Sequence, residues 1–160
     1  MKLTTRARYA LRAMLAISKM AEGNRLVSLG EVAERAHLPK RYLEQLAVSL
    51  KNASLLQSFS GRNGGYLPSR HSRDIKIRQI IEAAIGPISI VDCVSQPEIC
   101  IQSAECAYRR MYALINRKIN EAMDEFTLAD LAAGTIEPIE PVGASWASGS
   151  CPARPVAPSP

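Results

Sequence analysis

The sequence predicts a mainly α-helical protein, with one small β-hairpin in its first half and a long helix in its second half. Apolar residues recur at spacings of three and four in several segments, which is the period of amphipathic helices. The dipeptide Asn63-Gly64 separates two short runs that suit β-strands, and we expect a primed turn there, with positive φ at both positions. With 160 residues, 47% of them hydrophobic, the chain is long enough for one domain with a hydrophobic core.

Three helices are expected before the hairpin, at about residues 5–21, 28–38 and 39–53. The second begins with a capping box, in which the Ser28 hydroxyl and the Glu31 carboxylate each bond a free backbone N–H. A proline opens the third helix, where a missing N–H leaves no bond unmade. Two short helices joined by a tight turn, after a longer one, indicate a helix-turn-helix. The residues of the third helix expected to face inward are Leu43, Leu46, Ala47 and Leu50.

The outer face of the third helix carries side chains of the types that read base edges in DNA. Arg pairs with guanine, Gln with adenine, and Glu accepts from the cytosine amino group. A hairpin directly after such a helix is a wing, and an Arg at its tip suits a narrow minor groove. The fold class is therefore a winged helix-turn-helix. The candidate DNA-binding residues are Arg41, Tyr42, Glu44, Gln45 and Lys51 on the helix and Arg62, Asn63 and Gly64 in the hairpin.

The charge distribution supports a nucleic-acid partner for the first half of the chain. Residues 1–78 hold 15 Lys and Arg against 5 Asp and Glu, whereas residues 79–160 hold 5 against 10. Such asymmetry between halves points to a polyanionic partner, and we expect double-stranded DNA. A solvated basic face without a partner is the alternative.

Three of the four cysteines, Cys93, Cys100 and Cys106, fall within fourteen residues. We expect a cytoplasmic protein without a membrane span, because charged residues interrupt residues 1–20 and no apolar run is long enough to cross a bilayer. In that compartment clustered thiols are more often a metal site than disulfides, and thiolates select soft metals such as zinc or iron–sulfur clusters. Spacings of six and five residues are wider than those of zinc fingers. A structural or redox-active role for the three cysteines stays open.

The second half is expected to contain three further helices and a tail. A helix at about 78–85 should bury Ile80, Ile81, Ala84 and Ile85. A long helix at about 104–126 follows the cysteines, and its apolar stripe exceeds what the remaining chain can cover, which predicts a homodimer. A short helix is expected from Thr127 to Gly134. Residues 135–160 hold six of the ten prolines and should be disordered. The expected units are therefore residues 1–86, a winged-helix DNA-binding domain, residues 87–134, the cysteine loop and dimerisation helix, and the tail.

The residue pattern argues against an enzyme, since there is no nucleophile–base pair, no metal-binding histidine pair and no Gly-rich phosphate loop opening a helix. Two other classes stay open beside a metal-sensing DNA-binding protein. One is a DNA-binding thiol sensor without a cluster, which would use the same cysteines as redox groups. The other is a cluster carrier that retains the winged helix for protein contacts.

The chain resembles the winged-helix iron–sulfur transcription regulators of the IscR, NsrR and RirA type over about residues 1–133, and the IscR branch most. The residues that carry the resemblance are Met1-Lys-Leu-Thr4 with Tyr9-Ala10, Tyr42-Leu-Glu-Gln-Leu46, Arg62-Asn-Gly-Gly-Tyr66, Ile85-Gly-Pro87 and the three cysteines. The resemblance implies a homodimer with crossing long helices and a cluster held by Cys93, Cys100 and Cys106. It also implies that Glu44 adjusts sequence preference between cluster-bound and cluster-free forms.

Two positions depart from the family pattern. The IscR branch has a His three residues after the last Cys, and Arg109 stands there; the nitric-oxide-sensing branch uses an acid where Arg8 stands. Because Arg stays protonated, it cannot ligate a metal. The fourth ligand is then Glu98, Glu105, a small thiol or water, on a [2Fe–2S] cluster, which we favour, or a [4Fe–4S] cluster. The function expected from the resemblance is cluster-sensing regulation, as a repressor, of iron–sulfur, iron or redox-stress genes.

Overall fold

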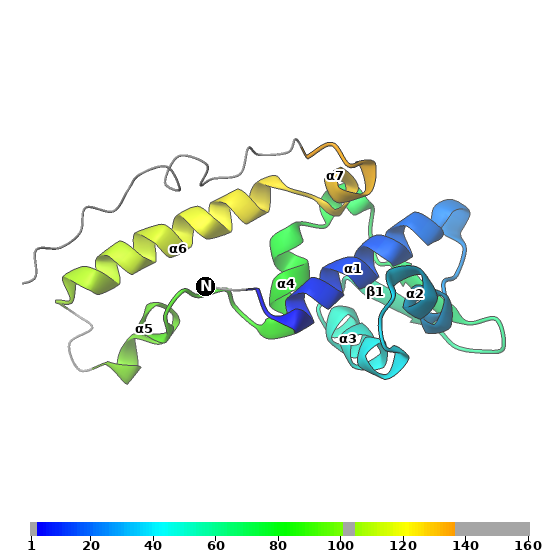
Figure 1. The fold of residues 1–160 in the computed structure, drawn as a ribbon, viewed down its shortest axis with the longest axis horizontal. Helices are drawn as coiled ribbons and strands as arrows, with labels where there is room; N and C mark the ends of the chain where they lie inside the picture. Colours follow the sequence, from blue (N-terminus) through cyan, green and yellow to red (C-terminus); the bar gives the residue numbers. More distant parts are fainter. Residues whose placement is uncertain (1–2, 101–104, 137–160) are drawn as a thin grey trace, which may run out of the picture.

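The computed structural model describes residues 3–100 and 105–136, and it confirms a mainly helical fold with a small antiparallel sheet (Figure 1). All but the first two residues of the expected tail lie outside the described residues. The elements, in chain order, are α1 (Thr5–Met20), η1 (Glu22–Asn24), α2 (Leu29–Ala36), α3 (Lys40–Asn52), β1 (Leu56–Phe59), β2 (Gly65–Pro68), η2 (Ser72–Asp74), α4 (Ile77–Ile85), α5 (Asp92–Ser95), η3 (Pro97–Ile99), α6 (Ala107–Glu125) and α7 (Leu128–Ala133).

Helix α1 is the centre of the hydrophobic core, and α2, α3, α4 and α7 all pack against it (Figure 1). Its buried face alternates small and large side chains, with Ala10 and Ala13 next to the fully buried Met14 and Ile17. Small residues let neighbouring helices approach closely, and the large ones fill the space between them. The Thr4 hydroxyl caps the helix by accepting from the Ala7 N–H at 3.2 Å.

The expected capping box at the start of α2 is confirmed. The Ser28 hydroxyl accepts from the Glu31 N–H, and the Glu31 carboxylate accepts from the Ser28 N–H at 2.9 Å. The hydrogen bond from the Ser28 backbone holds the pKa of Glu31 below its ordinary value. At the other end His37 adopts the left-handed conformation, with φ of 51°, and so turns the chain toward α3.

The hairpin is confirmed, but the primed turn expected at Asn63-Gly64 is wrong. The strands pair from Leu56 with Pro68 to Phe59 with Gly65, which leaves a five-residue loop. Neither Asn63 nor Gly64 has a positive φ; Gly61 does, at 118°, and its carbonyl accepts from the Gly64 N–H at 3.0 Å. The long loop places the sharp bend earlier, so the Asn-Gly signal located the hairpin without giving its turn type.

The segment after the hairpin joins the two halves of the chain. Ile75 is fully buried, and Lys76 pairs with Thr127 as an isolated bridge. Backbone bonds from Ile77 to Phe126 and from Leu128 to Ile75 flank this bridge. The start of α7 is therefore fastened to the core that α1 organises.

Helix α4 buries three of its four expected core residues. Ile80, Ile81 and Ala84 are buried, whereas Ile85 is 39% exposed. Ile85 is the last residue of the helix, and Gly86, with φ of 84°, turns the chain immediately after it, so the side chain stays at the exposed end of α4. The prediction that Ile85 is buried is thus wrong.

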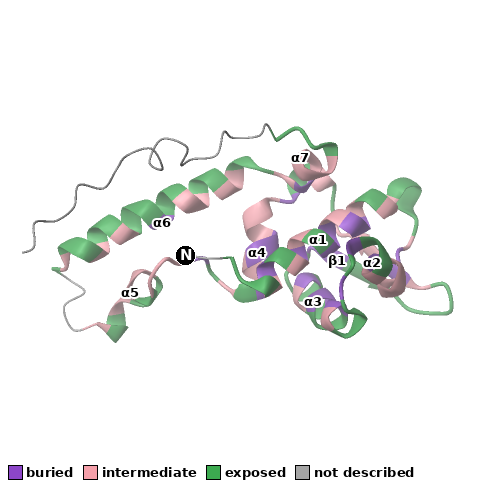
Figure 2. Cartoon of the chain, viewed as in Figure 1, coloured by how far each residue is buried: buried purple, intermediate pink, exposed green. Residues whose placement is uncertain are grey.

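Helix α6 extends away from the core, and most of its surface is exposed (Figures 1 and 2). Its one buried residue is Asn116. Near its C-terminal end, Arg78 of α4 donates to Asp124 at 2.8 Å, and this bond raises the pKa of Arg78 above its ordinary value. Across residues 3–100 and 105–136, no helix has both the length and the hydropathy that a membrane span requires.

Replacing Leu128 by Ala tests whether α7 is part of the main core. Leu128 is fully buried, so the Leu128→Ala variant should lose about 2–5 kcal/mol in free energy of unfolding, measured by urea denaturation. Leu131→Ala, in the same helix at a half-buried position, is the matched control and should lose clearly less. Equal losses in the two variants would contradict the placement of Leu128.

Candidate nucleic-acid interface and cysteine loop

Helix α3 presents a polar outer face opposite its buried one. Its inner face consists of the expected Leu43, Leu46, Ala47 and Leu50, all buried. Of the candidate DNA-binding residues, Arg41, Glu44, Gln45 and Lys51 are exposed. The structure therefore brings these four onto the solvent side of one helix, where their side chains are free to reach base edges or phosphates.

Tyr42, the fifth candidate on α3, is half-buried and packed against α1. Its ring meets that of Tyr9 edge-on, with centroids 5.5 Å apart and an interplanar angle of 87°. The Arg12 guanidinium lies 5.9 Å from the centre of the Tyr9 ring, within cation–π range. Tyr42 is thus a fixed residue at the start of α3, linked through Tyr9 to a cation on α1.

Sequence reasoning missed Val48 on the outer face of α3. Its side chain is 59% exposed, although valine is usually found inside. Helical periodicity was a sufficient signal, because Val48 lies four residues after Glu44 and three after Gln45 and so shares their face. An aliphatic side chain on the exposed face of a DNA-binding helix can contact the methyl group of thymine.

Sequence reasoning also missed the role of Arg6, near the start of α1. Its Nε donates to the Ala84 carbonyl at 2.6 Å, and its terminal nitrogen donates to the Ser49 hydroxyl at 2.9 Å. One guanidinium therefore joins α1, α3 and α4. No local pattern signals such a contact, because the partners lie 43 and 78 residues away along the chain.

The hairpin tip carries the other three candidates in different roles. Arg62 and Asn63 are exposed at the tip. Gly64 is required by packing, because a Cβ atom at this position would lie 2.3 Å from the Phe59 carbonyl oxygen. The base of the hairpin is tied to the segment before α2, since Val27 and Tyr66 exchange backbone bonds of 3.1 and 2.8 Å. The wing is therefore held against the helix-turn-helix.

The three candidate metal ligands lie on successive pieces of one loop. Cys93 is in α5, Cys100 follows η3, and Cys106 is the N-cap of α6. Each is half-buried and free of disulfide bonds. As soft sulfur donors they fit an iron–sulfur cluster chemically. Within the described ranges, however, no three His, Cys, Asp or Glu side chains come together as a metal site, and residues 101–104 between Cys100 and Cys106 are outside those ranges.

The side chain of Arg109 contacts the backbone of this loop. Its Nε donates to the Cys93 carbonyl at 2.9 Å, which joins the first turn of α6 to α5. The residue that stands where the resemblance expects a histidine ligand thus binds the loop as a hydrogen-bond donor.

Asn116 is a second link between α6 and the segment that leads to the cysteines. Its Nδ2 donates to the Ile88 carbonyl and its Oδ1 accepts from the Ile90 N–H, both at 3.1 Å. The side chain is buried, so these two bonds satisfy groups that water does not reach. Sequence reasoning missed it, although an Asn placed between Tyr112 and Ile119 at helical spacing was an available signal.

The rest of α6 exposes apolar side chains in a row. Tyr108 is 72% exposed and Leu114 is 50% exposed, and both lie on the half of the helix farther from the core. Met111 and Ile115 continue the row and are exposed as well. Contiguous exposed apolar side chains mark an interaction surface.

Comparison with known proteins gives the family context. The model of the Rrf2 family, described as "Iron-dependent Transcriptional regulator", matches residues 3–134. The HTH-type transcriptional regulator CymR of Bacillus subtilis is 35% identical over 135 residues, which cover 84% of this chain and 92% of CymR.

Solved structures agree with this match. The structure of B. subtilis CymR, described as the global cysteine regulator, has a TM-score of 0.69 at 34% identity, covering 84% of this chain and 98% of that one. The structure of T. potens IscR has a TM-score of 0.67 at 30% identity, covering 84% and 88%.

Replacing Asn116 by Ala tests the link between α6 and the loop. The substitution leaves the Ile88 carbonyl and the Ile90 N–H without partners, so amide hydrogen exchange at Ile90 should speed up and the unfolding free energy should fall by about 1–3 kcal/mol. The measurement is hydrogen exchange followed by NMR. Lys118→Ala, on the exposed side of α6, should leave exchange at Ile90 unchanged. Unaltered exchange in both variants would show that the Asn116 bonds do not hold the segment.

Proposed function

Because the chain belongs to the Rrf2 family of winged-helix transcriptional regulators, we propose that it reads its operator as a homodimer under the control of an iron–sulfur cluster. The family consists of DNA-binding transcriptional regulators and not of enzymes. We propose in addition the dimer, the residues that read DNA and the cluster. The observation that carries it is the position of Cys93, Cys100 and Cys106 directly before the long helix with the exposed apolar row.

The exposed surface of α6 supports the homodimer. A nineteen-residue helix is about 30 Å long, and its apolar row of Tyr108, Met111, Leu114 and Ile115 has no cover within the described part of the chain. A second copy of the same helix supplies a matching surface, since a two-fold interface brings one patch against itself. Dimers of this kind place two reading helices on the two halves of a symmetric operator.

DNA reading is assigned to α3 and the wing. Arg41, Glu44, Gln45 and Val48 would read base edges in the major groove, and Arg62 would enter the minor groove beside it. The contacts of Lys51 and Tyr42 would be with phosphates, which position the protein without reading sequence. The support is the exposure of all of these side chains except that of the half-buried Tyr42, on one face of α3 and on the hairpin tip.

The cluster is assigned to Cys93, Cys100 and Cys106 with a fourth ligand that is not Arg109. The remaining candidates are Glu98 and Glu105, both exposed, or a small thiol or water. When bound, such a cluster supplies a centre that responds to oxidants, nitric oxide or iron supply. The chain would pass a change in the loop to α6 through Cys106, which occupies the N-cap position of the helix, and through the Arg109 bond to Cys93.

A cluster-free thiol sensor is the second candidate, and one observation favours it. Among the residues that the structure describes, the half-buried thiols do not gather with other ligands into a metal site. Oxidation of these cysteines would then change the same loop, and the same links to α6 would carry the change.

Anaerobic reconstitution separates the two candidates. We expect the purified protein to bind iron and sulfide and to show a visible absorption band, and the Cys100→Ala variant to lose both. Operator affinity, measured by gel shift without oxygen, should differ between the reconstituted and apo forms. The Arg73→Gln variant, altered away from the loop, is the control and should keep iron and colour. Colourless, iron-free protein whose DNA binding changes on thiol oxidation would support the thiol sensor and contradict the proposed cluster.

Val48 gives a direct test of base reading. A duplex first selected by binding from a randomised pool is remade with deoxyuridine in place of thymine, one position at a time. Loss of one methyl contact, worth about 0.8 kcal/mol, should weaken binding of the wild type by about fourfold at the contacted position. The Val48→Ala variant should bind both duplexes equally. A uracil effect that is the same in both proteins would exclude a contact between Val48 and thymine.

A further inference from the structure

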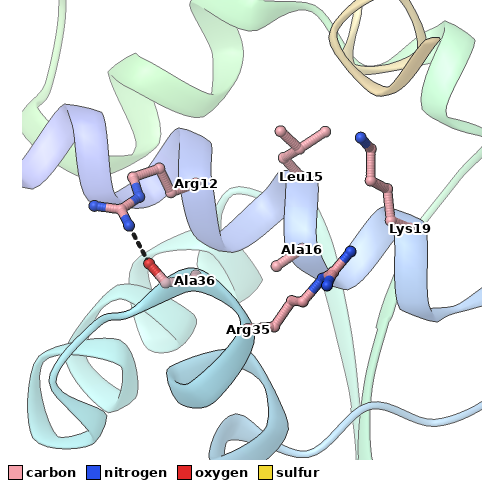
Figure 3. A pocket seen from close by; sticks show the side chains of 6 residues that line it. All are labelled: Arg12, Leu15, Ala16, Lys19, Arg35 and Ala36. Atoms are coloured by element: carbon pink, nitrogen blue, oxygen red, sulfur yellow. Dashed lines mark hydrogen bonds between the residues drawn. The ribbon is translucent and has the colours of Figure 1, made fainter. Parts of the chain in front are cut away.

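We propose that the pocket between α1 and α2 binds a small, multiply charged anion, free in solution, and that this site communicates with the DNA-reading helix. The pocket has a volume of about 310 Å³, at the lower end of the range for small-molecule sites (Figure 3). It is distinct from the cysteine loop and from the outer face of α3. Its lining residues are Arg12, Leu15, Ala16, Lys19, Arg35 and Ala36.

The charge of the lining determines the class of ligand. Three of its side chains, Arg12, Lys19 and Arg35, are cations, and none of the lining residues is acidic. Among the described residues, none of the three forms an ion pair with a carboxylate. Three unneutralised cations around one hollow repel each other, and an anion with two or three negative charges relieves that repulsion.

The floor of the pocket is small and apolar. Ala16 and Ala36 are buried, and Leu15 is half-buried beside them. In Figure 3 the Arg35 side chain extends from α2 and lies below Ala16, and Lys19 lies on the next turn of α1. Short side chains in the floor keep the hollow open, so the ligand is a compact molecule with phosphate or carboxylate groups and a short carbon skeleton.

Arg12 connects this pocket to α3 by two routes. It donates a hydrogen bond to the carbonyl of Ala36, the last residue of α2, directly before the turn into α3 (Figure 3). It also lies over the Tyr9 ring, which packs edge-on against Tyr42 of α3. A ligand that attracts the Arg12 guanidinium would weaken both contacts and so shift the start of the reading helix.

The test is a titration of the isotope-labelled full chain with pyrophosphate at constant ionic strength, followed by NMR. Pyrophosphate should shift the amides of Leu15, Ala16 and Ala36 with saturation. Lys19→Gln and Arg35→Gln should each weaken this binding by about tenfold, because each removes one charge-assisted hydrogen bond. Both side chains are exposed, so the variants should keep the wild-type melting temperature. Arg73→Gln, which removes one exposed positive charge elsewhere, is the matched control and should bind as the wild type does.

Three results would overturn the proposal. The first is the lack of saturable shifts at these amides. The second is an equal loss of binding in Arg73→Gln and Arg35→Gln, which would indicate general charge attraction. The third is that a DNA duplex of arbitrary sequence displaces pyrophosphate and itself shifts the same amides. That result would show that the pocket contacts the phosphates of the DNA backbone. None of these results depends on whether the cysteines hold a cluster, so the proposed function is tested separately.

Discussion

The packing of four helices around α1 is the constraint on which the other features depend. The buried face of α1 alternates alanines with Met14 and Ile17, so α2, α3, α4 and α7 can all approach it closely. This packing fixes the angle at which α3 presents its polar face, and Arg6 adds hydrogen bonds from α1 to α3 and α4. The same core contains Leu128 of α7, the helix that follows α6, so the DNA-binding unit and the end of the segment that carries the cysteines share one hydrophobic core.

The cysteine loop is connected to this core through α6. Asn116 holds the backbone before Cys93, Arg109 holds the Cys93 carbonyl, and Arg78 joins α4 to Asp124 near the other end of α6. A helix transmits a displacement along its axis because its backbone bonds keep it stiff. The loop therefore lies where a chemical change can alter the relation between α6 and the DNA-reading unit, whichever chemistry the sulfurs perform.

The two proposals together give α3 two regulatory inputs. In these proposals the cysteine loop would act through α6, and the cationic pocket would act on the turn between α2 and α3 through Arg12. Each input depends on polar contacts between a few side chains and main-chain carbonyls. Such contacts have modest net free energies, so a ligand or a redox event of ordinary strength is sufficient to rearrange them.

The sequence by itself determined the helices, the capping box at Ser28, the wing, the cysteine cluster and the polar face of α3, because these follow from helical periodicity and from turn and cap chemistry within a few residues. It also carried the family resemblance that the comparisons bear out. Tertiary structure alone decided the loop geometry at Gly61, the exposure of Ile85, the contacts of Arg6 and Asn116, and the gathering of three cations around one hollow. These features join residues that are distant along the chain, and local patterns hold no information about which distant groups the packing brings together.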